Sequence, residues 1–282
     1  MKRSLRGYLS DTRKRFHATF YGQNFIDKIK LLFSAVLLSI PNSFVEKARV
    51  LEHAREYANK VAANVKIRVG ETVFHVVDFE SVTILSGSFE QWMWKYLQVS
   101  DGGAFVDVGA HVGKYTVQVA KLHPESMVIA FEPNPENFRA LEKNVEENRL
   151  SNVRLYNLAA WNRRGVLKLY TGDKGGHHSV KRGFGRGYDI VQATTLDDIV
   201  REAGVGRVDV VKVDVEGAEA EAVEGALETI RKHRPKLVIE IFDSPEKILK
   251  LLPPEYSCEK VADAYYLFYS NTSSVRYNSP VL

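Results

Sequence analysis

An acidic residue and two glycines lie close together where a buried strand gives way to a helix, in the segment FVDVGAHVGKYT. Asp107 falls at the end of the apolar run, Gly109 follows it, and Gly113 stands where the helical pattern starts. Glycines at such a turn let backbone amides approach a ligand, and the amino terminus of the next helix favours a carboxylate or phosphate. Asp107 either serves a cationic ligand or only caps the turn. The segment predicts a binding site for a small charged ligand.

A second acid, Glu132 in the segment FEPNP, follows the next apolar run. A carboxylate at this place can accept hydrogen bonds from both hydroxyls of a ribose, so the two segments together indicate a cofactor that contains a nucleoside. A nicotinamide dinucleotide would require the spacing G-x-G-x-x-G, which Gly109 and Gly113 do not provide. S-adenosylmethionine carries a sulfonium and an amino group and suits Asp107 better. We therefore expect S-adenosylmethionine, with a nicotinamide-dependent dehydrogenase as a minor alternative.

The third segment, VDVVKVDVEGAEAEAVEGA, places charged residues inside an apolar run. Strand alternation puts Lys212, Asp214 and Glu216 on one side of the chain and the intervening valines on the other. A lysine within a buried parallel strand is costly unless it is paired, so we expect Lys212 to neutralise Asp214 or Asp107. Both acids fall near carboxyl ends of strands, as does Glu240, and open α/β sheets bind their ligands at that edge.

These segments resemble the FkbM-type methyltransferases, a family within the class I S-adenosylmethionine-dependent fold. The matching motifs are FVDVGAHVG, FEPNPENFRALEKNV and VKVDVEGAEAEAVEGA, with TTLDDIV between the last two. The resemblance spans residues 89 to 242, and the last motif is the most specific. It implies a Rossmann-like sheet of seven strands, mostly parallel with one antiparallel strand, and transfer of a methyl group, usually to oxygen.

The resemblance also implies which residues bind the cofactor. Members of the family commonly carry Asn where this chain has His111, a change that is harmless if the backbone makes the contact. The implied contacts are Asp107, Gly109 and Gly113 at the methionine part, Glu132 at the ribose, Glu90 and Thr116 at the amino-acid end, and the stretch from Asn157 to Ala160 beside the adenine.

Methyl transfer from a sulfonium needs little beyond positioning the acceptor and removing its proton. Asp214 is our candidate for general base, hydroxyl orienter or metal ligand, with Lys212 tuning its charge, although a purely structural salt bridge between them is the alternative. His177 or His178 could act as base from a glycine-rich loop. No metal site is enforced by spacing, but Asp214 with Glu240 or Asp243 could supply oxygen ligands to Mg²⁺.

The loop between Thr171 and Gly187 contains six glycines and an excess of positive charge. A loop of this length in a compact fold is either a mobile linker or a segment that closes on a ligand. Its cations favour an acceptor that carries phosphate or carboxylate, such as a sugar nucleotide, a lipid-linked glycan or an acidic sugar. We therefore expect a small-molecule or glycan acceptor with negative charge.

The elements that must position these residues follow from periodicity. From Gly103 onward, apolar runs and helical patterns alternate, which is typical of a mostly parallel sheet covered on both faces. The expected strands are 104–108, 126–131, 152–160, 208–214 and 236–242, followed by a strand pair in 257–270. The expected helices are 111–122, 134–150 (capped by Asn134 with Pro135 in the first turn), 217–233 and one that starts at Ser244-Pro245.

The part before residue 103 has a different character. Residues 25–40 and 42–63 predict two helices, residues 65–79 a hairpin that turns at Gly70-Glu71, and residues 89–97 a short aromatic helix. We expect an N-terminal helical segment over residues 1–65 and a methyltransferase domain with a leading hairpin over residues 66–282. The length of 282 residues allows this division.

Composition sets the remaining limits. Cys258 is the only cysteine, which excludes an internal disulfide and a multi-cysteine zinc site and fits a reducing, cytoplasmic location. The apolar run 31–40 is too short to cross a bilayer and lies too far from the start for a signal peptide.

The sequence does not identify a binding partner for the basic amino-terminal arm. Residues 1–30 contain eight basic and two acidic side chains, a net charge of +6. We expect a solvated arm, with an RNA-binding protein or RNA methyltransferase as the alternative, although the arm contains few aromatic residues for base stacking. Residues 25–40 pack on the main body or rest on a membrane surface from the cytoplasmic side. The sequence leaves the oligomeric state open.

Overall fold

Seven strands form the central sheet in the computed structural model, which describes residues 5–40, 48–63, 65–86, 89–171, 178–181 and 187–271. Their order is β12-β13-β11-β10-β3-β4-β5, with β13 antiparallel to both neighbours and the other pairs parallel. The mostly parallel seven-stranded sheet expected from the sequence is therefore confirmed. The strands are β3 (Ala104–Val108), β4 (Met127–Phe131), β5 (Val153–Tyr156), β10 (Val210–Val213), β11 (Lys236–Glu240), β12 (Tyr256–Lys260) and β13 (Tyr265–Ser270).

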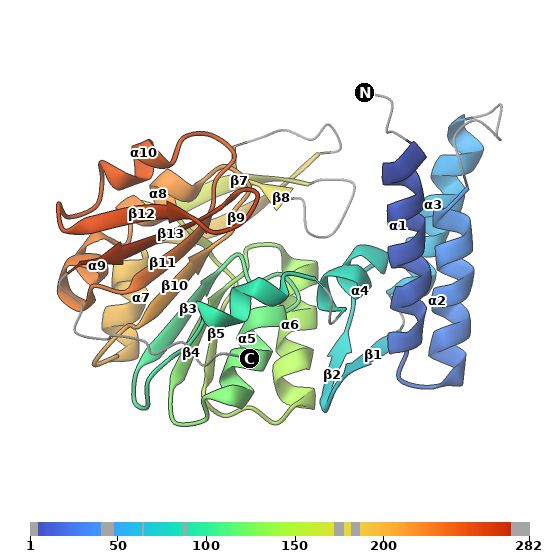
Figure 1. Cartoon of the computed structure of the whole chain (residues 1–282), viewed down its shortest axis with the longest axis horizontal. Helices are drawn as coiled ribbons and strands as arrows, with labels where there is room; N and C mark the ends of the chain where they lie inside the picture. Colours follow the sequence, from blue (N-terminus) through green and yellow to red (C-terminus); the bar gives the residue numbers. More distant parts are fainter. Residues whose placement is uncertain are drawn as a thin grey trace.

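Helices cover both faces of this sheet because its strands are apolar on both sides (Figure 1). Val106 and Val108 of β3 belong to one core cluster with Ile199 and Ala222, whereas Phe105 belongs to another with Val119. The first face is covered by α7 (Leu196–Ala203), α8 (Glu219–Glu224), α9 (Leu227–His233) and α10 (Pro245–Leu249), the second by α5 (Lys114–Leu122) and α6 (Pro135–Glu147).

One of the expected helices is confirmed at its cap, and another is divided in two. The Asn134 side chain caps α6 as expected, accepting hydrogen bonds from the amides of Glu136 and Asn137. The single helix expected over 217–233 was wrong, because the chain breaks into α8 and α9 around Gly225. A Cβ on Gly225 would lie 2.0 Å from the carbonyl oxygen of Trp161, so tertiary packing at this point requires glycine.

A second sheet of four strands lies beside the first and was not expected. Its order is β6-β9-β7-β8, and the two long strands, β7 and β9, flank the glycine-rich segment as an antiparallel pair. Residues 172–177 and 182–186 of that segment lie outside the described part of the chain. The strands are β6 (Ala159–Ala160), β7 (Gly165–Thr171), β8 (His178–Ser179) and β9 (Tyr188–Thr194).

The amino-terminal part forms three helices that stand side by side at one end of the molecule (Figure 1). The two helices and the hairpin expected there are confirmed, but two further helices, α1 and α4, were not predicted. The signal for α4 was present, since the Asp78 side chain caps it by accepting from the Ser81 amide. The elements are α1 (Leu5–Ala18), η1 (Thr19–Tyr21), α2 (Phe25–Leu38), α3 (Ala48–Ala62), β1 (Lys66–Val69), β2 (Thr72–His75), α4 (Phe79–Leu85) and η3 (Gln91–Lys95).

This part is fastened to the sheet by hydrogen bonds and by a shared core. The His75 amide of β2 donates to the Asn144 side chain of α6 at 2.6 Å. Leu31 of α2 and Val82 of α4 belong to the same buried cluster as Val117 of α5. The hairpin and α4 thus connect the helices to the α5–α6 face, and α4 reaches the edge of the sheet where the site lies.

Candidate active site

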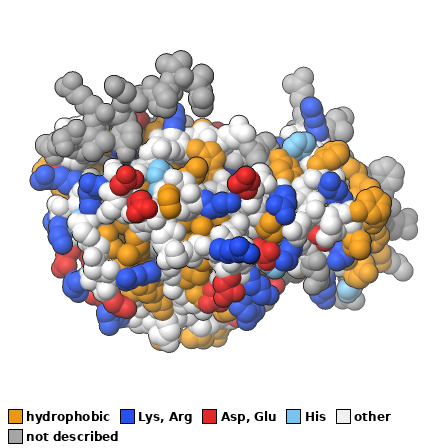
Figure 2. Space-filling view, turned by 90° about the horizontal axis from the view of Figure 1, so that it is seen from below, with side chains coloured by type: hydrophobic (Ala, Val, Ile, Leu, Met, Phe, Trp, Pro, Cys, Tyr) orange, Lys and Arg blue, Asp and Glu red, His pale blue; other side chains and the backbone are white. Residues whose placement is uncertain are grey.

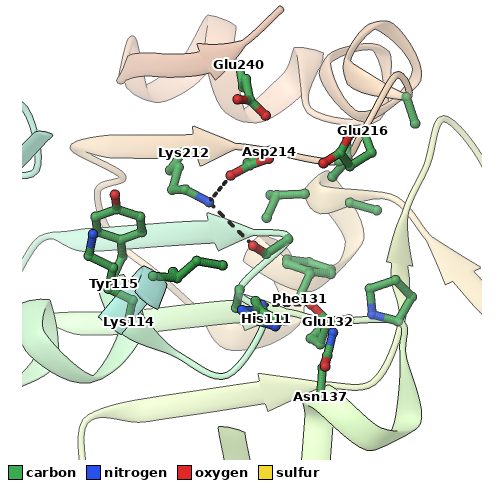
Figure 3. Close-up of a pocket in the computed structure, with 18 of the residues that line it drawn as sticks. His111, Lys114, Tyr115, Phe131, Glu132, Asn137, Lys212, Asp214, Glu216 and Glu240 are labelled. Atoms are coloured by element: carbon green, nitrogen blue, oxygen red, sulfur yellow. Dashed lines mark hydrogen bonds and ion pairs between the residues drawn. The ribbon is translucent and has the colours of Figure 1, made fainter. Parts of the chain in front are cut away.

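A cavity of about 360 Å³ lies at the carboxyl ends of β3, β4 and β10. The chain leaves β3 toward β4 and β5 on one side and later returns to β10 on the other, so the cavity occupies the point where the strand order reverses. Further wall segments come from α4, β6, β11 and the start of β13. Figure 3 shows acidic side chains from several strands converging on this space.

A buried lysine links two acids at the base of the cavity. The Lys212 ammonium lies 3.5 Å from Asp107 Oδ1 and 3.3 Å from Asp214 Oδ2 (Figure 3). Lys212 on β10 is directly in register with Asp107 on β3. Burial by itself lowers the pKa of Lys212, but the charges of Asp214 and Asp107 outweigh it and raise that pKa above its ordinary value. The lysine therefore remains charged, and it neutralises both acids that the sequence analysis proposed as partners.

Asp107 is fully buried behind the cavity wall and is held from the other side by Thr116. The Thr116 hydroxyl donates to Asp107 Oδ2 at 2.7 Å and its amide at 3.1 Å. Neither residue lines the cavity. Asp107 thus lies between Thr116 and the Lys212 ammonium, and the ligand contacts predicted for Asp107 and Thr116 stay predictions.

Asp214 lies in the cavity wall and is surrounded by donors. The Tyr265 hydroxyl donates to its Oδ2 at 3.3 Å. Burial and the charge of Asp214 raise the pKa of Glu240 to about 10, so Glu240 is protonated near neutral pH and can donate to Asp214. Burial by itself raises the pKa of Asp214, but the Lys212 charge and the hydrogen bond from Glu240 reverse the shift and lower it. Asp214 is thus an ionised acceptor that faces the cavity.

A second tyrosine–carboxylate pair lies nearby. The Tyr115 hydroxyl donates to Glu90, and burial together with the Glu90 charge raises the pKa of Tyr115, which stays protonated. The neighbouring Lys114 donates from its ammonium to the carbonyl of Phe89 at 2.6 Å, and burial lowers its pKa to about 8. Lys114 therefore adds a cation whose charge is sensitive to mildly alkaline pH.

Glu132 ends β4 on the opposite side of the cavity. Its two carboxylate oxygens accept from the amides of His111 at 2.7 Å and Asn134 at 2.8 Å. Burial raises the pKa of Glu132 to about 7, although these amide hydrogen bonds oppose the shift. A carboxylate has about four acceptor positions, so Glu132 keeps capacity for further donors such as ribose hydroxyls.

The two glycines of the predicted turn serve the protein's own packing. A Cβ on Gly109, where φ is +80°, would lie 1.8 Å from the carbonyl oxygen of Asp214. A Cβ on Gly113 would lie 2.5 Å from Leu141, and Gly113 does not line the cavity. The amides of Gly109 and Ala110 both donate to the Phe131 carbonyl. Both glycines are thus fixed by packing inside the protein, although Gly109 also lines the cavity, and their contact with a cofactor stays a prediction.

Three non-glycine residues in the cavity wall adopt left-handed backbone conformations, which cost free energy and concentrate at functional sites. They are Glu90, His111 and Glu216, with φ of 50°, 54° and 54°. At His111 the backbone amide makes the contact to Glu132, and Asn, which the resemblance implies at this position, tolerates this conformation well. Having His rather than Asn at position 111 therefore does not affect the hydrogen bond from this backbone amide to Glu132.

The remaining predicted residues divide into three groups. Ala160 and its neighbour Ala159 line the cavity as expected. Asn157 does not, since its side chain donates to the carbonyl oxygens of Glu132 and Pro133. His177 lies outside the described residues, and only the backbone of His178 is described.

The metal-ligand hypothesis finds no support in the geometry. Over the described ranges, no group of three or more His, Cys, Asp or Glu side chains is arranged to hold a metal ion. Asp243 instead forms an exposed ion pair with Lys247. Glu240, the other suggested ligand, lies beside Asp214, whose charge and burial raise the pKa of Glu240.

Sequence reasoning missed Lys114, Tyr115 and Tyr265, and it placed Glu240 at the ligand-binding edge of the sheet without foreseeing its contact with Asp214. Tyr115 lies within the segment FVDVGAHVGKYT, but no spacing there marks its hydroxyl for the site, and Tyr265 lies in a strand outside the motifs. The one available signal was position, since Glu240 ends a strand and Tyr265 begins its antiparallel neighbour, at the same edge of the sheet.

The chain matches the family model described as "Methyltransferase FkbM domain" over residues 107–262. Similar curated proteins include "Methyltransferase 1" of Beauveria bassiana, 26% identical over 51% of this chain and 66% of that protein. The "2-O-methyltransferase NoeI" of Sinorhizobium fredii is 26% identical over 46% and 59% of the two chains. The "31-O-demethyl-FK506 methyltransferase FkbM" of Streptomyces tacrolimicus is 24% identical over 65% and 83%. The chain thus spans just under two thirds of the length of several relatives that it matches.

Two solved structures superpose on parts of this chain. A crystal structure of methyltransferase FkbM from Methylobacillus flagellatus superposes with a TM-score of 0.47 at 16% identity, over 94% of this chain and 60% of that chain. TYW2 of M. jannaschii in complex with AdoMet gives a TM-score of 0.40 at 17% identity, over 72% and 82%.

Proposed function

Because this chain belongs to the FkbM methyltransferase family, we propose that it transfers the methyl group of S-adenosylmethionine to a hydroxyl oxygen of a sugar, glycan or other small molecule. The observation that carries the proposal is one cavity with Glu132 on one wall and the ionised Asp214 on the other. The first can hold a ribose and the second an acceptor hydroxyl. The 2-O- and 31-O-methyltransferases among the relatives support oxygen as the methylated atom.

The chemistry of the cavity wall fits S-adenosylmethionine. Carboxylates outnumber ammonium groups there, which suits a ligand with a sulfonium and an amino group. Glu132 would accept from the ribose hydroxyls, and the apolar wall around Phe131, Ala160 and Leu169 would cover the adenine. Lys114 is placed to meet the methionine carboxylate. When bound, the cofactor supplies an electrophilic methyl group that needs no further activation.

On the acceptor side, Asp214 would orient the hydroxyl and take up its proton as the oxygen is methylated. Tyr265 and the protonated Glu240 hold Asp214 in place by hydrogen bonds, and Lys212 keeps it ionised until the acceptor's proton arrives. A protonated carboxyl and a carboxylate in contact titrate as a pair; once Asp214 has taken the acceptor's proton both carboxyls are protonated, and one proton leaves to solvent before the next turnover.

The charge near the cavity favours a neutral hydroxylated acceptor. Lys181 is the cation of the glycine-rich loop that the structure describes, and its ammonium pairs with Glu221 at 2.5 Å. Its charge is thus compensated within the protein. The anionic acceptor expected from the loop would depend on Lys174, Arg182 and Arg186, which lie outside the described residues.

The proposal is tested by mixing the purified chain with S-adenosylmethionine labelled in its methyl group and a panel of sugars, oligosaccharides and hydroxylated small molecules. We expect label in an ether linkage, identified by mass spectrometry, with release of S-adenosylhomocysteine. Label on nitrogen or carbon would contradict O-methylation. Failure to bind S-adenosylhomocysteine in calorimetry would contradict the cofactor assignment itself.

The affinity for S-adenosylhomocysteine should depend on pH through Glu132. Its pKa of about 7 means that the carboxylate is lost as pH falls, and the acid accepts ribose hydroxyls less well. Between pH 8 and pH 5.5 we expect the dissociation constant to rise by about tenfold in all, and above pH 8 it should rise again as Lys114 loses its charge. Isothermal titration calorimetry from pH 5.5 to 8.5 measures this dependence.

The matched variants are Glu132→Gln and Glu136→Gln. The first should bind about tenfold more weakly at pH 8 and lose the pH dependence below pH 8. Glu136 is exposed in the first turn of α6, and its variant should follow the wild-type curve. An unchanged pH dependence in Glu132→Gln would assign the titration to another group.

A further inference from the structure

Helix α2 presents its most apolar side to solvent. Leu31 and Ala35 of this helix are fully buried, but larger apolar side chains point outward. Six of them have exposed fractions near or above one half: Phe25 (75%), Ile26 (64%), Ile29 (50%), Val36 (49%), Leu32 (47%) and Phe33 (46%). We call these six residues the α2 apolar face.

The α2 apolar face is continuous. At 3.6 residues per turn, its six side chains fall within an arc of roughly 120°, and the buried Leu31, Ser34 and Ala35 lie on the opposite side. Phe20 of η1 adds an exposed ring, and Tyr57 of α3 contacts Phe33 edge-on with 6.2 Å between ring centroids. Figure 2 shows this apolar surface gathered at the end of the molecule formed by the helices. A contiguous patch of this kind marks an interaction surface.

Basic residues border the same face. On the helical wheel Lys28 lies just outside one edge of the arc and Lys30 just outside the other. The neighbouring α1 exposes Arg13 and Lys14, whereas Asp27, the acid within α2, is buried on the inner side. An apolar stripe that lies between lysines matches the boundary between acyl chains and anionic headgroups.

We propose that the α2 apolar face binds the surface of an anionic lipid bilayer, with α2 lying in the plane of the membrane. The helix has 14 residues, and no helix in the described part of the chain is long and apolar enough to cross a bilayer. The inference does not depend on methyl transfer.

The charges and side-chain types of this face favour a membrane over a second copy of the chain or a nucleic acid. In a twofold dimer through this face, the lysines at both edges would meet their own copies with no exposed acid on α2 to offset them. A nucleic acid would gain little from a stripe made mainly of aliphatic side chains, because base stacking needs rings. An anionic bilayer offers acyl chains to the apolar stripe and negatively charged headgroups to the lysines that border it.

The test is co-sedimentation of the full chain with vesicles of phosphatidylcholine that contain roughly 30% phosphatidylglycerol. We expect binding that weakens in high salt and is much weaker with phosphatidylcholine alone. The variant Phe25→Ser/Ile29→Ser/Val36→Ser should lower the partition coefficient on the order of 100-fold. These side chains are exposed, so its thermal unfolding midpoint should match that of the wild type.

The matched control is Val166→Ser/Ile190→Ser, which removes exposed apolar side chains from β7 and β9 and should bind vesicles like the wild type. Equal vesicle binding by the wild-type chain and the α2 variant would overturn the proposal. So would a wild-type dimer, seen by ultracentrifugation without lipid, that the α2 variant makes monomeric while vesicle binding is absent. Tight binding to single-stranded RNA that the α2 variant abolishes, without binding to vesicles, would assign the surface to nucleic acid.

Discussion

Asp214→Asn is expected to lower kcat by roughly 10²- to 10⁴-fold, the range associated with loss of a positioned proton acceptor. The amide keeps the size of the side chain and can still accept from Tyr265, but it cannot take up the proton of the acceptor hydroxyl. Steady-state kinetics with the identified acceptor, together with the dissociation constant of S-adenosylhomocysteine, measure the effect. The latter should stay within about threefold of the wild type.

A purely structural role for Asp214 predicts another outcome. Asn would then remove one partner of Lys212, whose second partner Asp107 remains, and the main effect would be a lower unfolding midpoint with kcat nearly unchanged. Asp209→Asn is the control. Asp209 directly precedes β10, at the edge of the sheet opposite the cavity, where it pairs with Arg207. A kcat within tenfold of the wild type for Asp214→Asn would remove it from the proton-transfer step.

Lys212→Met is expected to lower the free energy of unfolding by about 3 to 5 kcal/mol, the usual cost of breaking a buried ion pair by removal of one partner. Methionine fills a similar volume, but it leaves the fully buried Asp107 without its cation. Chemical denaturation at neutral pH measures the change. The double variant Lys212→Met/Asp107→Asn should recover part of the loss, since it removes the uncompensated charge.

The control for this variant is Lys236→Met on the adjacent strand β11. Lys236 is half-buried at the opposite end of the sheet, where burial lowers its pKa, and its replacement should cost less than about 1 kcal/mol. Equal losses in Lys212→Met and Lys236→Met would mean that the ion network contributes no more than ordinary packing.

The sequence by itself determined the parallel core and the side of the strand on which the charges lie. The apolar runs after Gly103 predict buried strands because both faces of such a sheet are covered, and the strands β3, β4, β10 and β11 confirm this. Alternation along one strand is a local property, so Lys212 and Asp214 were correctly placed on the same side of the chain.

Only the tertiary structure decided which groups meet across strands. The register between β3 and β10 sets Lys212 beside Asp107, and the antiparallel pairing of β13 with β11 brings Tyr265 to Asp214 and Glu240. Gly109 is a further example, since the carbonyl that fills the space beside it belongs to Asp214, which is distant in the sequence. The sequence could not predict that the apolar side of α2 faces solvent. Periodicity indicates that a helix has an apolar stripe, but packing alone determines whether that stripe is buried.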